Sequence, residues 1–295
     1  MAINILLTDT SSPLGIGLRN KFESTTFRFV AEHPAELSWR DESQVREYLA
    51  EVKPHLVLNT IGWGEGTAIK PDLLADGAEC LGRCLAGSSA SVLHLSSYRI
   101  FHGEGKVSHT EADVPKAASD LSKAFAQAES AILGALPSSL VLRSSWVLST
   151  EGGSLLARLL ADFEAGRSTV ISEHWRGTPV MVSDVVRAVY AVTQQIIYGA
   201  NNWGVMHFGS SDVCSESVFA HKIQDMVQAE TGRLLQLEAI ETETDNSAVL
   251  EVRRLRDCFG LQPRSWRQGL RPAVRRWLDR RGLLAEVDSA VVEND

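Results

Sequence analysis

The first 150 residues alternate short apolar runs with longer segments whose apolar positions recur at helical spacing. The apolar runs predict β-strands at residues 3–8, 26–31, 55–59, 91–96 and 139–143. The periodic segments between them predict helices at residues 14–22, 42–52, 73–85 and 117–136. Short, fully apolar strands that alternate with helices are typical of a parallel sheet with helices on both faces. The pattern therefore predicts an α/β fold built on a doubly wound parallel sheet.

After residue 150 the pattern changes, and helices dominate. We expect helices at residues 153–163, 183–197, 215–230 and 264–281, with short strands near residue 170 and at residues 205–208. This half predicts a smaller, mostly helical lobe over residues 151–284, interleaved with a nucleotide-binding domain of residues 1–150. The lobe is expected to close over the carboxyl ends of the strands, where such sheets bind ligands. Residues 285–295 form an acidic tail without a repeating apolar face, which we expect to be frayed.

Composition excludes several classes of function. The net charge is −8, from 29 Lys and Arg against 37 Asp and Glu, and this argues against a nucleic-acid surface. The arginines of residues 253–256 and 264–281 recur at helical spacing among leucines and tryptophans, so we interpret them as solvated helix faces. No segment has the roughly 20 consecutive apolar residues of a membrane span, and the N-terminus lacks the positive region of a signal peptide. We therefore expect a cytoplasmic protein with no membrane partner.

The cysteines predict no metal site. The four of them form no recognised ligand spacing, and we interpret the first two as small buried residues on one helical face: Cys80, Cys84, Cys214 and Cys258.

Two segments of the first half are similar to motifs of the dTDP-4-dehydrorhamnose reductases, a family of extended, atypical short-chain dehydrogenase/reductases. Residues 96–103, Ser-Ser-Tyr-Arg-Ile-Phe-His-Gly, resemble the family's Ser-Thr-Asp-Tyr-Val-Phe-Asp-Gly. Residues 142–147, Leu-Arg-Ser-Ser-Trp-Val, resemble its Leu-Arg-Thr-Ser-Trp-Val strand. The first turn, residues 8–15, reads Thr-Asp-Thr-Ser-Ser-Pro-Leu-Gly, where a family-like version would read Thr-Gly-x-x-Gly-x-x-Gly.

The second half continues the resemblance in the same order. Residues 177–179, Gly-Thr-Pro, with Asp184 after them match the family's Gly-x-Pro-Thr-x-x-x-Asp segment. Residues 255–260 and 266–270 resemble its C-terminal end. The similarity spans Asn4 to about Leu278 and implies a Rossmann-like fold, although fold does not settle function.

The resemblance implies three catalytic groups, of which two persist. An active member uses a Tyr hydroxyl as the acid, a Lys four residues later that lowers its pKa and holds the ribose, and a Ser or Thr that hydrogen-bonds the carbonyl. Lys123 and Ser97 match the second and third groups, but the Tyr position holds Ser119. A Ser hydroxyl is shorter and far less acidic than a phenol. Tyr98 is a candidate substitute acid, against a packing aromatic, and His102 is another, against an ordinary loop residue.

The cofactor motif is altered in parallel. Glycines in the first turn let the backbone approach a pyrophosphate at the helix N-terminus. Here Asp9 and Ser12 occupy the first two glycine positions, and only Gly15 remains. Asp9 and Ser12 can equally be read as helix caps. The candidate cofactor-binding residues are Asp9, Thr10, Ser12, Leu14, Gly15, Asn59, Thr60, Gly62 and Lys123. If a dinucleotide binds, NAD is more natural than NADP, because no Arg follows the second strand to accept a 2′-phosphate.

The expected substrate lobe is better preserved. Trp146 offers a flat face to a sugar or base, and Arg176 is available to a diphosphate. Core packing of the Trp and a structural or surface role for the Arg remain alternatives. The candidate substrate-binding residues are Tyr98, His102, Trp146, His174 and Arg176.

Three functions remain open from the sequence. The first, which the altered motifs favour, is a degenerate reductase that binds a sugar nucleotide, a nucleotide or a partner protein. The second is an active NAD(P)H-dependent reductase of a nucleotide-activated 4-keto-6-deoxy sugar with a rearranged proton donor. The third is a pure interaction scaffold whose crevice is filled by its own side chains. The possible partners are a sugar nucleotide, another protein or a second copy of this chain in a homodimer. The superfamily contains a non-catalytic precedent, the regulatory β subunit of methionine adenosyltransferase.

Overall fold

A six-stranded parallel sheet forms the centre of the larger part of the molecule. The computed structural model describes residues 3–62, 71–101, 106–241 and 247–285. The strands lie in the order β10-β5-β4-β3-β1-β2 and every pair in the sheet is parallel. Their bounds are β1 Asn4–Leu7, β2 Arg28–Val30, β3 Leu56–Asn59, β4 Ser91–Ser97, β5 Ser139–Ser144 and β10 Gly204–Phe208.

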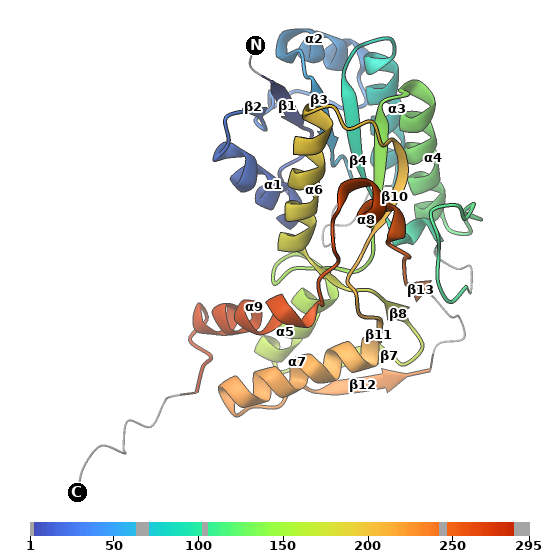
Figure 1. Cartoon of the computed structure of the whole chain (residues 1–295). Coiled ribbons are helices and arrows are strands. Elements are labelled where there is room, and N and C mark those ends of the chain that lie inside the picture. Colours follow the sequence, from blue (N-terminus) through green and yellow to red (C-terminus); the bar gives the residue numbers. More distant parts are fainter. Residues whose placement is uncertain (1–2, 63–70, 102–105, 242–246, 286–295) are drawn as a thin grey trace, which may run out of the picture.

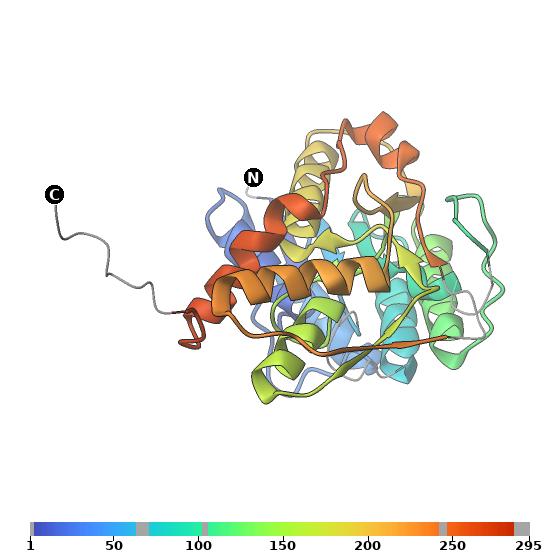
Figure 2. The same ribbon diagram turned by 90° about the horizontal axis from the view of Figure 1, so that it is seen from below.

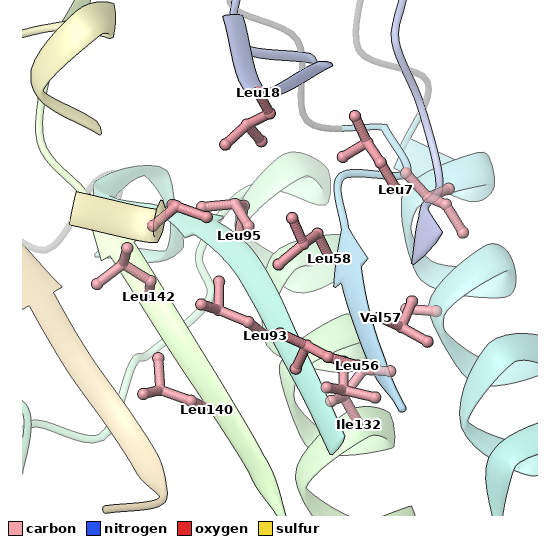
Figure 3. Close-up of a cluster of buried hydrophobic side chains, with 14 of the residues drawn as sticks. Leu7, Leu18, Leu56, Val57, Leu58, Leu93, Leu95, Ile132, Leu140 and Leu142 are labelled. Carbon is pink, nitrogen blue, oxygen red and sulfur yellow. The ribbon is translucent and has the colours of Figure 1, made fainter. Parts of the chain in front are cut away.

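Helices cover both faces of this sheet. Helices α1 and α6 contact each other on one side, and α2, α3 and α4 pack in a row on the other (Figure 1). Their bounds are α1 Pro13–Glu23, α2 Glu42–Val52, α3 Pro71–Leu85, α4 Asp120–Ala135 and α6 Val182–Ile197. Figure 3 shows leucines from β1, β3, β4 and β5 meeting Leu18 of α1 and Ile132 of α4 in one core. The predicted doubly wound α/β sheet is confirmed.

The chain reverses its direction across the sheet between β1 and β3. After β1 it moves outwards to β2, and it then returns to the other side of β1 to form β3 and, beyond it, β4 and β5. Such a switch leaves a crevice at the carboxyl ends of the strands, where ligands of these folds bind. Asp9 and Thr60 follow β1 and β3 at this switch point.

The smaller lobe lies beyond the carboxyl ends of the strands (Figures 1 and 2). Its core combines α5, α7 and α9 with short strands, and the described part contains these elements: β6 Val147–Leu148, α5 Leu155–Ala165, β7 Thr169–Ser172, β8 Arg176–Gly177, β9 Val180–Met181, β11 Cys214–Ser215, α7 Glu216–Thr231, β12 Leu237–Ile240, β13 Ser247–Ala248 and α9 Arg267–Asp279. The chain returns from the lobe to the sheet for α6, for β10 and for α8 Arg253–Phe259, which packs against β10, so the two cores are interleaved in sequence.

Two predicted helix starts are corrected by local geometry. Helix α4 begins at Asp120 and not at Ala117, because Ala117 has a φ of 47° and Ser119 caps the helix. Helix α9 begins at Arg267 and not at Arg264. The described part of the chain contains no helix long and apolar enough to cross a membrane.

Candidate functional site

A pocket of about 170 Å³ lies where the carboxyl ends of β4 and β5 meet the lobe. We call it the interlobe pocket. Its described lining combines aromatic and charged residues with the start of α5: Tyr98, Arg99, Trp146, Gly153, Ser154, Leu155, Arg158, Trp175 and Glu216. Tyr98 and Arg99 belong to the 3-10 turn η1 Tyr98–Phe101 that follows β4, whereas Arg158 and Glu216 belong to α5 and α7. Both parts of the fold therefore contribute to one site.

The aromatic walls are held by close packing. Trp146 is 7% exposed, and a Cβ on Gly177 would come within 2.8 Å of its indole ring, so only glycine lets the backbone lie this close. The Val180 N–H donates to the Trp146 carbonyl at 2.8 Å, which fixes the segment between β5 and β6. Tyr98 packs against both the sheet core and the lobe core. The lobe core includes Trp146, so this indole is at once a core residue and a pocket wall.

A half-buried ion pair forms the charged wall. Arg158 donates a short hydrogen bond to Glu216 Oε1, and the Ser172 N–H donates to Glu216 Oε2 at 3.0 Å. The Glu216 side chain is 6% exposed, and that of Arg158 is 47% exposed. The carboxylate is therefore enclosed, while the guanidinium reaches the pocket.

The predicted Tyr and Lys positions lie outside the interlobe pocket, in the first turn of α4. Ser119 is the N-cap: its Oγ accepts the Ser122 N–H at 3.1 Å, and its own N–H donates to Ser122 Oγ at 2.8 Å. The Lys123 side chain is 63% exposed, with Nζ 3.3 Å from Asp120 Oδ1. Neither Ser119 nor Lys123 lines the pocket. Both side chains serve the start of the helix.

Ser97 and Tyr98 have different surroundings, because β4 ends at Ser97 and Tyr98 begins the 3-10 turn η1. Ser97 is buried at the end of β4, and its Oγ accepts the Arg99 N–H at 3.3 Å. Tyr98 lines the pocket, with the Arg99 guanidinium 6.0 Å from the centre of its ring. The pocket therefore presents the Tyr98 side chain and not the Ser97 hydroxyl.

Two side chains of the turn after β1 accept hydrogen bonds from backbone N–H groups of the same segment. Asp9 Oδ1 accepts the Ser11 N–H at 2.8 Å, and Ser12 Oγ accepts the Gly15 N–H at 3.0 Å. Pro13 occupies the first position of α1 and has no N–H. A Cβ on Gly15 would lie 2.5 Å from the Asp9 carbonyl oxygen and 2.8 Å from Thr10 Cα, so the retained glycine packs the helix against the turn. Leu14, beside it, is fully buried in the core.

The residues that follow β3 are also committed to internal contacts. Asn59 Oδ1 accepts from the Thr8 hydroxyl at 3.2 Å, and its Nδ2 lies 3.0 Å from His94 Nδ1. Thr60 Oγ1 donates to the Asp9 carbonyl at 3.0 Å and accepts the Asp9 N–H at 3.1 Å. Both side chains are fully buried, and burial lowers the pKa of His94 to about 4. This network joins β1, β3 and β4.

Gly62 ends this segment with a φ of 67°, a conformation that favours glycine.

The first turn is poorly suited to a dinucleotide's pyrophosphate in this conformation. The site needs free backbone N–H groups at the start of α1 and no like charge nearby, but the donors of Ser11 and Gly15 are already bonded and the Asp9 carboxylate stands at the turn. The neighbouring space after β2 holds aromatic side chains. His33 Nδ1 is 2.9 Å from the Tyr48 hydroxyl, and the His33 ring meets that of Trp39 edge-on. Burial lowers the pKa of His33.

The remaining predicted site residues do not join the pocket. His174 and Arg176 are exposed and flank Trp175, and only Trp175 lines the pocket. His102 lies outside the described residues. The sequence interpretation missed Arg158 and Glu216 because their contact joins segments 58 residues apart. A larger pocket of about 480 Å³, lined in part by Lys53 and His55, lies at the amino ends of the strands and contains none of the predicted site residues.

Comparison with known proteins agrees with this architecture. The profile of the RmlD substrate binding domain matches residues 3–278. A dTDP-4-dehydrorhamnose reductase of Sinorhizobium fredii is 24% identical over 208 residues, which cover 68% of this chain and 70% of the relative. The spore coat polysaccharide biosynthesis protein SpsK of Bacillus subtilis is 23% identical over 276 residues, which cover 90% of this chain and 95% of the relative.

Solved structures show the same fold. A dTDP-4-dehydrorhamnose reductase of Clostridium acetobutylicum superposes with a TM-score of 0.79 at 20% identity, covering 95% of this chain and 100% of that one. The reductase of Bacillus anthracis, solved in complex with NADP, gives 0.76 at 17% identity, covering 95% and 99%. The Bordetella bronchiseptica enzyme WbmG, solved with NAD and UDP, gives 0.77 at 15% identity, covering 96% and 97%. This chain belongs to the RmlD substrate binding domain family, the extended short-chain dehydrogenase/reductases that resemble dTDP-4-dehydrorhamnose reductase.

Proposed function

We propose that this protein binds a nucleotide-activated sugar at the interlobe pocket and does not carry out hydride transfer. One observation carries the second half of the proposal. The two residues that correspond to the family's Tyr and Lys, Ser119 and Lys123, are bonded within the first turn of α4 and lie outside the pocket. A Ser hydroxyl that caps a helix cannot replace a phenol as the acid that protonates a substrate oxygen.

The first turn supports the same proposal. Its carboxylate and its capped N–H groups disfavour a pyrophosphate, and without a bound dinucleotide the reaction has no hydride source. Support for the sugar nucleotide comes from the relatives, whose names specify dTDP-linked sugars, and from WbmG, which was solved with UDP. In this chain Tyr98, Trp146 and Trp175 supply the flat apolar faces that sugars and bases contact.

A second candidate function follows from the position of Tyr98. Its side chain lines the pocket, so it is the described phenol best placed to act as a substitute acid. In that case the protein is an active reductase of a nucleotide-activated 4-keto sugar, and it must bind NADH or NADPH despite the altered turn.

Calorimetric titration separates the two functions. We expect no saturable binding of NADH or NADPH up to millimolar concentration, and saturable binding of dTDP-glucose or UDP-glucose. A Ser12→Gly, Asp9→Gly double variant is the matched control, because it restores both glycines and a Ser-to-Gly cap change costs only a few tenths of a kcal/mol. Gain of NADH binding by this variant identifies the turn as the cause.

A turnover assay tests the claim that the protein does not transfer hydride. Oxidation of NADH or NADPH that depends on a dTDP-4-keto-6-deoxy sugar, and that Tyr98→Phe abolishes, establishes the reductase function instead. Failure of every nucleotide sugar to bind refutes the ligand-binding half.

A further inference from the structure

The guanidinium of Arg158 in the interlobe pocket is held in place by the carboxylate of Glu216. The carboxylate of Glu216 is enclosed, and its two oxygens accept from Arg158 and from the Ser172 N–H. Glu216 is therefore unavailable to a ligand. Arg158 is 47% exposed, and its hydrogen bond to Glu216 occupies one of five N–H groups. A ligand in the pocket therefore meets the hydrogen-bond donors of Arg158 and not the carboxylate of Glu216.

The start of α5 adds positive potential at the same wall. Gly153, Ser154 and Leu155 line the pocket where this helix of 11 residues begins, and Arg158 lies one turn further along. Helix N-termini attract negative charge, and a guanidinium that is already oriented binds carboxylate or phosphate with little loss of entropy. This wall is therefore complementary to a group that only accepts hydrogen bonds.

We infer that Arg158 receives a negatively charged group of the ligand, while the aromatic side chains contact the adjoining ring, and that Glu216 is a positioning residue for Arg158. The inference rests on the proposed function for the identity of the ring as part of a nucleotide sugar. A space of about 170 Å³ is well below the roughly 300–1,000 Å³ of ordinary ligand pockets, so it suits a single ring with its anionic substituent. The anion is either the diphosphate or a carboxylate on the sugar.

Affinities of matched variants test the role of Arg158. The wild type, Arg158→Met and Arg167→Met are titrated with dTDP-glucose, UDP-glucose and UDP-glucuronate. Arg167 follows the same helix and also pairs with a carboxylate, Asp162, but it does not line the pocket. We expect Arg158→Met to lose roughly ten- to hundred-fold in affinity, as is usual for a hydrogen bond between charged groups, and Arg167→Met to remain within twofold of the wild type.

The pattern across ligands identifies the anion. An equal loss for every nucleotide sugar that binds assigns Arg158 to the diphosphate, and a loss confined to UDP-glucuronate assigns it to the sugar carboxylate. An Arg158→Met affinity within twofold of the wild type for all of them overturns the inference while the proposed function stands. If the wild type binds none of the three, the proposed function fails and this inference fails with it.

A double-mutant cycle tests the positioning role of Glu216. Glu216→Gln keeps the shape of the side chain but removes the charge that orients Arg158. We expect Glu216→Gln to weaken nucleotide-sugar binding in the wild-type background and to have no effect on it in the Arg158→Met background. An equal effect in both backgrounds shows that Glu216 acts on the fold alone and overturns its assignment.

Discussion

The buried ion pair between α4 and β5 provides the sharpest test of how the sheet is held together. Arg143 Nε lies 2.9 and 3.1 Å from the two carboxylate oxygens of Glu129, and Arg143 Nη2 lies 2.7 Å from Oε2. The two side chains are 5% and 4% exposed. The Ser96 hydroxyl donates to the same carboxylate at 2.6 Å, and the guanidinium lies 5.1 Å from the centre of the Phe101 ring.

Removal of one partner leaves the other buried without compensation. Breaking a buried ion pair typically costs about 3–5 kcal/mol, and we expect Glu129→Gln to fall in this range because Arg143 Nη1 already has no hydrogen-bond partner among the described residues. Arg143→Met should cost less as the pH is lowered, since the stranded carboxyl group can take up a proton. Urea unfolding followed by circular dichroism measures the free energy of unfolding of both variants at pH 7, and that of Arg143→Met also at lower pH.

The double variant and a surface control complete this test. Glu129→Gln combined with Arg143→Met removes both charges, so it should cost clearly less than the sum of the two single changes. Arg19→Met, which breaks an exposed pair with Glu23, should cost no more than about 0.5 kcal/mol. A Glu129→Gln cost below about 1 kcal/mol, or additive costs in the double variant, refutes the reasoning.

Two further predictions concern stability. Gly15→Ala should lower the free energy of unfolding measured in urea by about 1–3 kcal/mol, because its Cβ would lie 2.5 Å from the Asp9 carbonyl oxygen. Gly134→Ala on α4 is the control, since its Cβ meets nothing within 4 Å, and it should raise the free energy of unfolding by up to about 1 kcal/mol. Equal effects of the two substitutions would contradict this. Burial lowers the pKa of His207 to about 3 in the folded protein, whereas a His in the unfolded chain has a pKa of about 6.5. Below pH 6.5 the unfolded chain therefore binds more protons than the folded one, and the free energy of unfolding should fall as the pH drops from 6.5 to 5. His207→Leu should flatten this slope by up to about 1.4 kcal/mol per pH unit.

The sheet could be predicted from the sequence because its strands are buried on both faces. All four residues of β3 and all six of β5 are buried, so a continuous apolar run is a direct record of their environment. The start of α4 was less visible. Ser119 and Ser122 form a capping box, but the usual sequence signature places Glu or Gln at the second position, and the positive φ of Ala117 leaves no trace in the apolar pattern.

The site could be predicted only where chemistry is local. The substitutions at Asp9 and Ser12 are readable as caps, because each accepts from a backbone N–H two or three residues away. The pair of Arg158 and Glu216 is not readable, because it depends on how α5 and α7 pack. At residues 174–176, the sequence singled out His174 and Arg176 as ligand contacts, yet Trp175 between them is the residue that lines the pocket.

The side-chain hydrogen bonds in the first turn determine how much dinucleotide affinity is lost there. The N–H groups of Ser11 and Gly15 are held by Asp9 and Ser12, and a pyrophosphate that uses these donors must displace both side chains. A hydrogen bond of this kind contributes about 0.5–1.5 kcal/mol, so two correspond to roughly fivefold to hundredfold weaker binding, before any repulsion from the Asp9 carboxylate. The Asp9→Gly, Ser12→Gly variant should recover a factor of this size for NADH. Nucleotide-sugar affinity should stay the same, because the interlobe pocket uses neither residue.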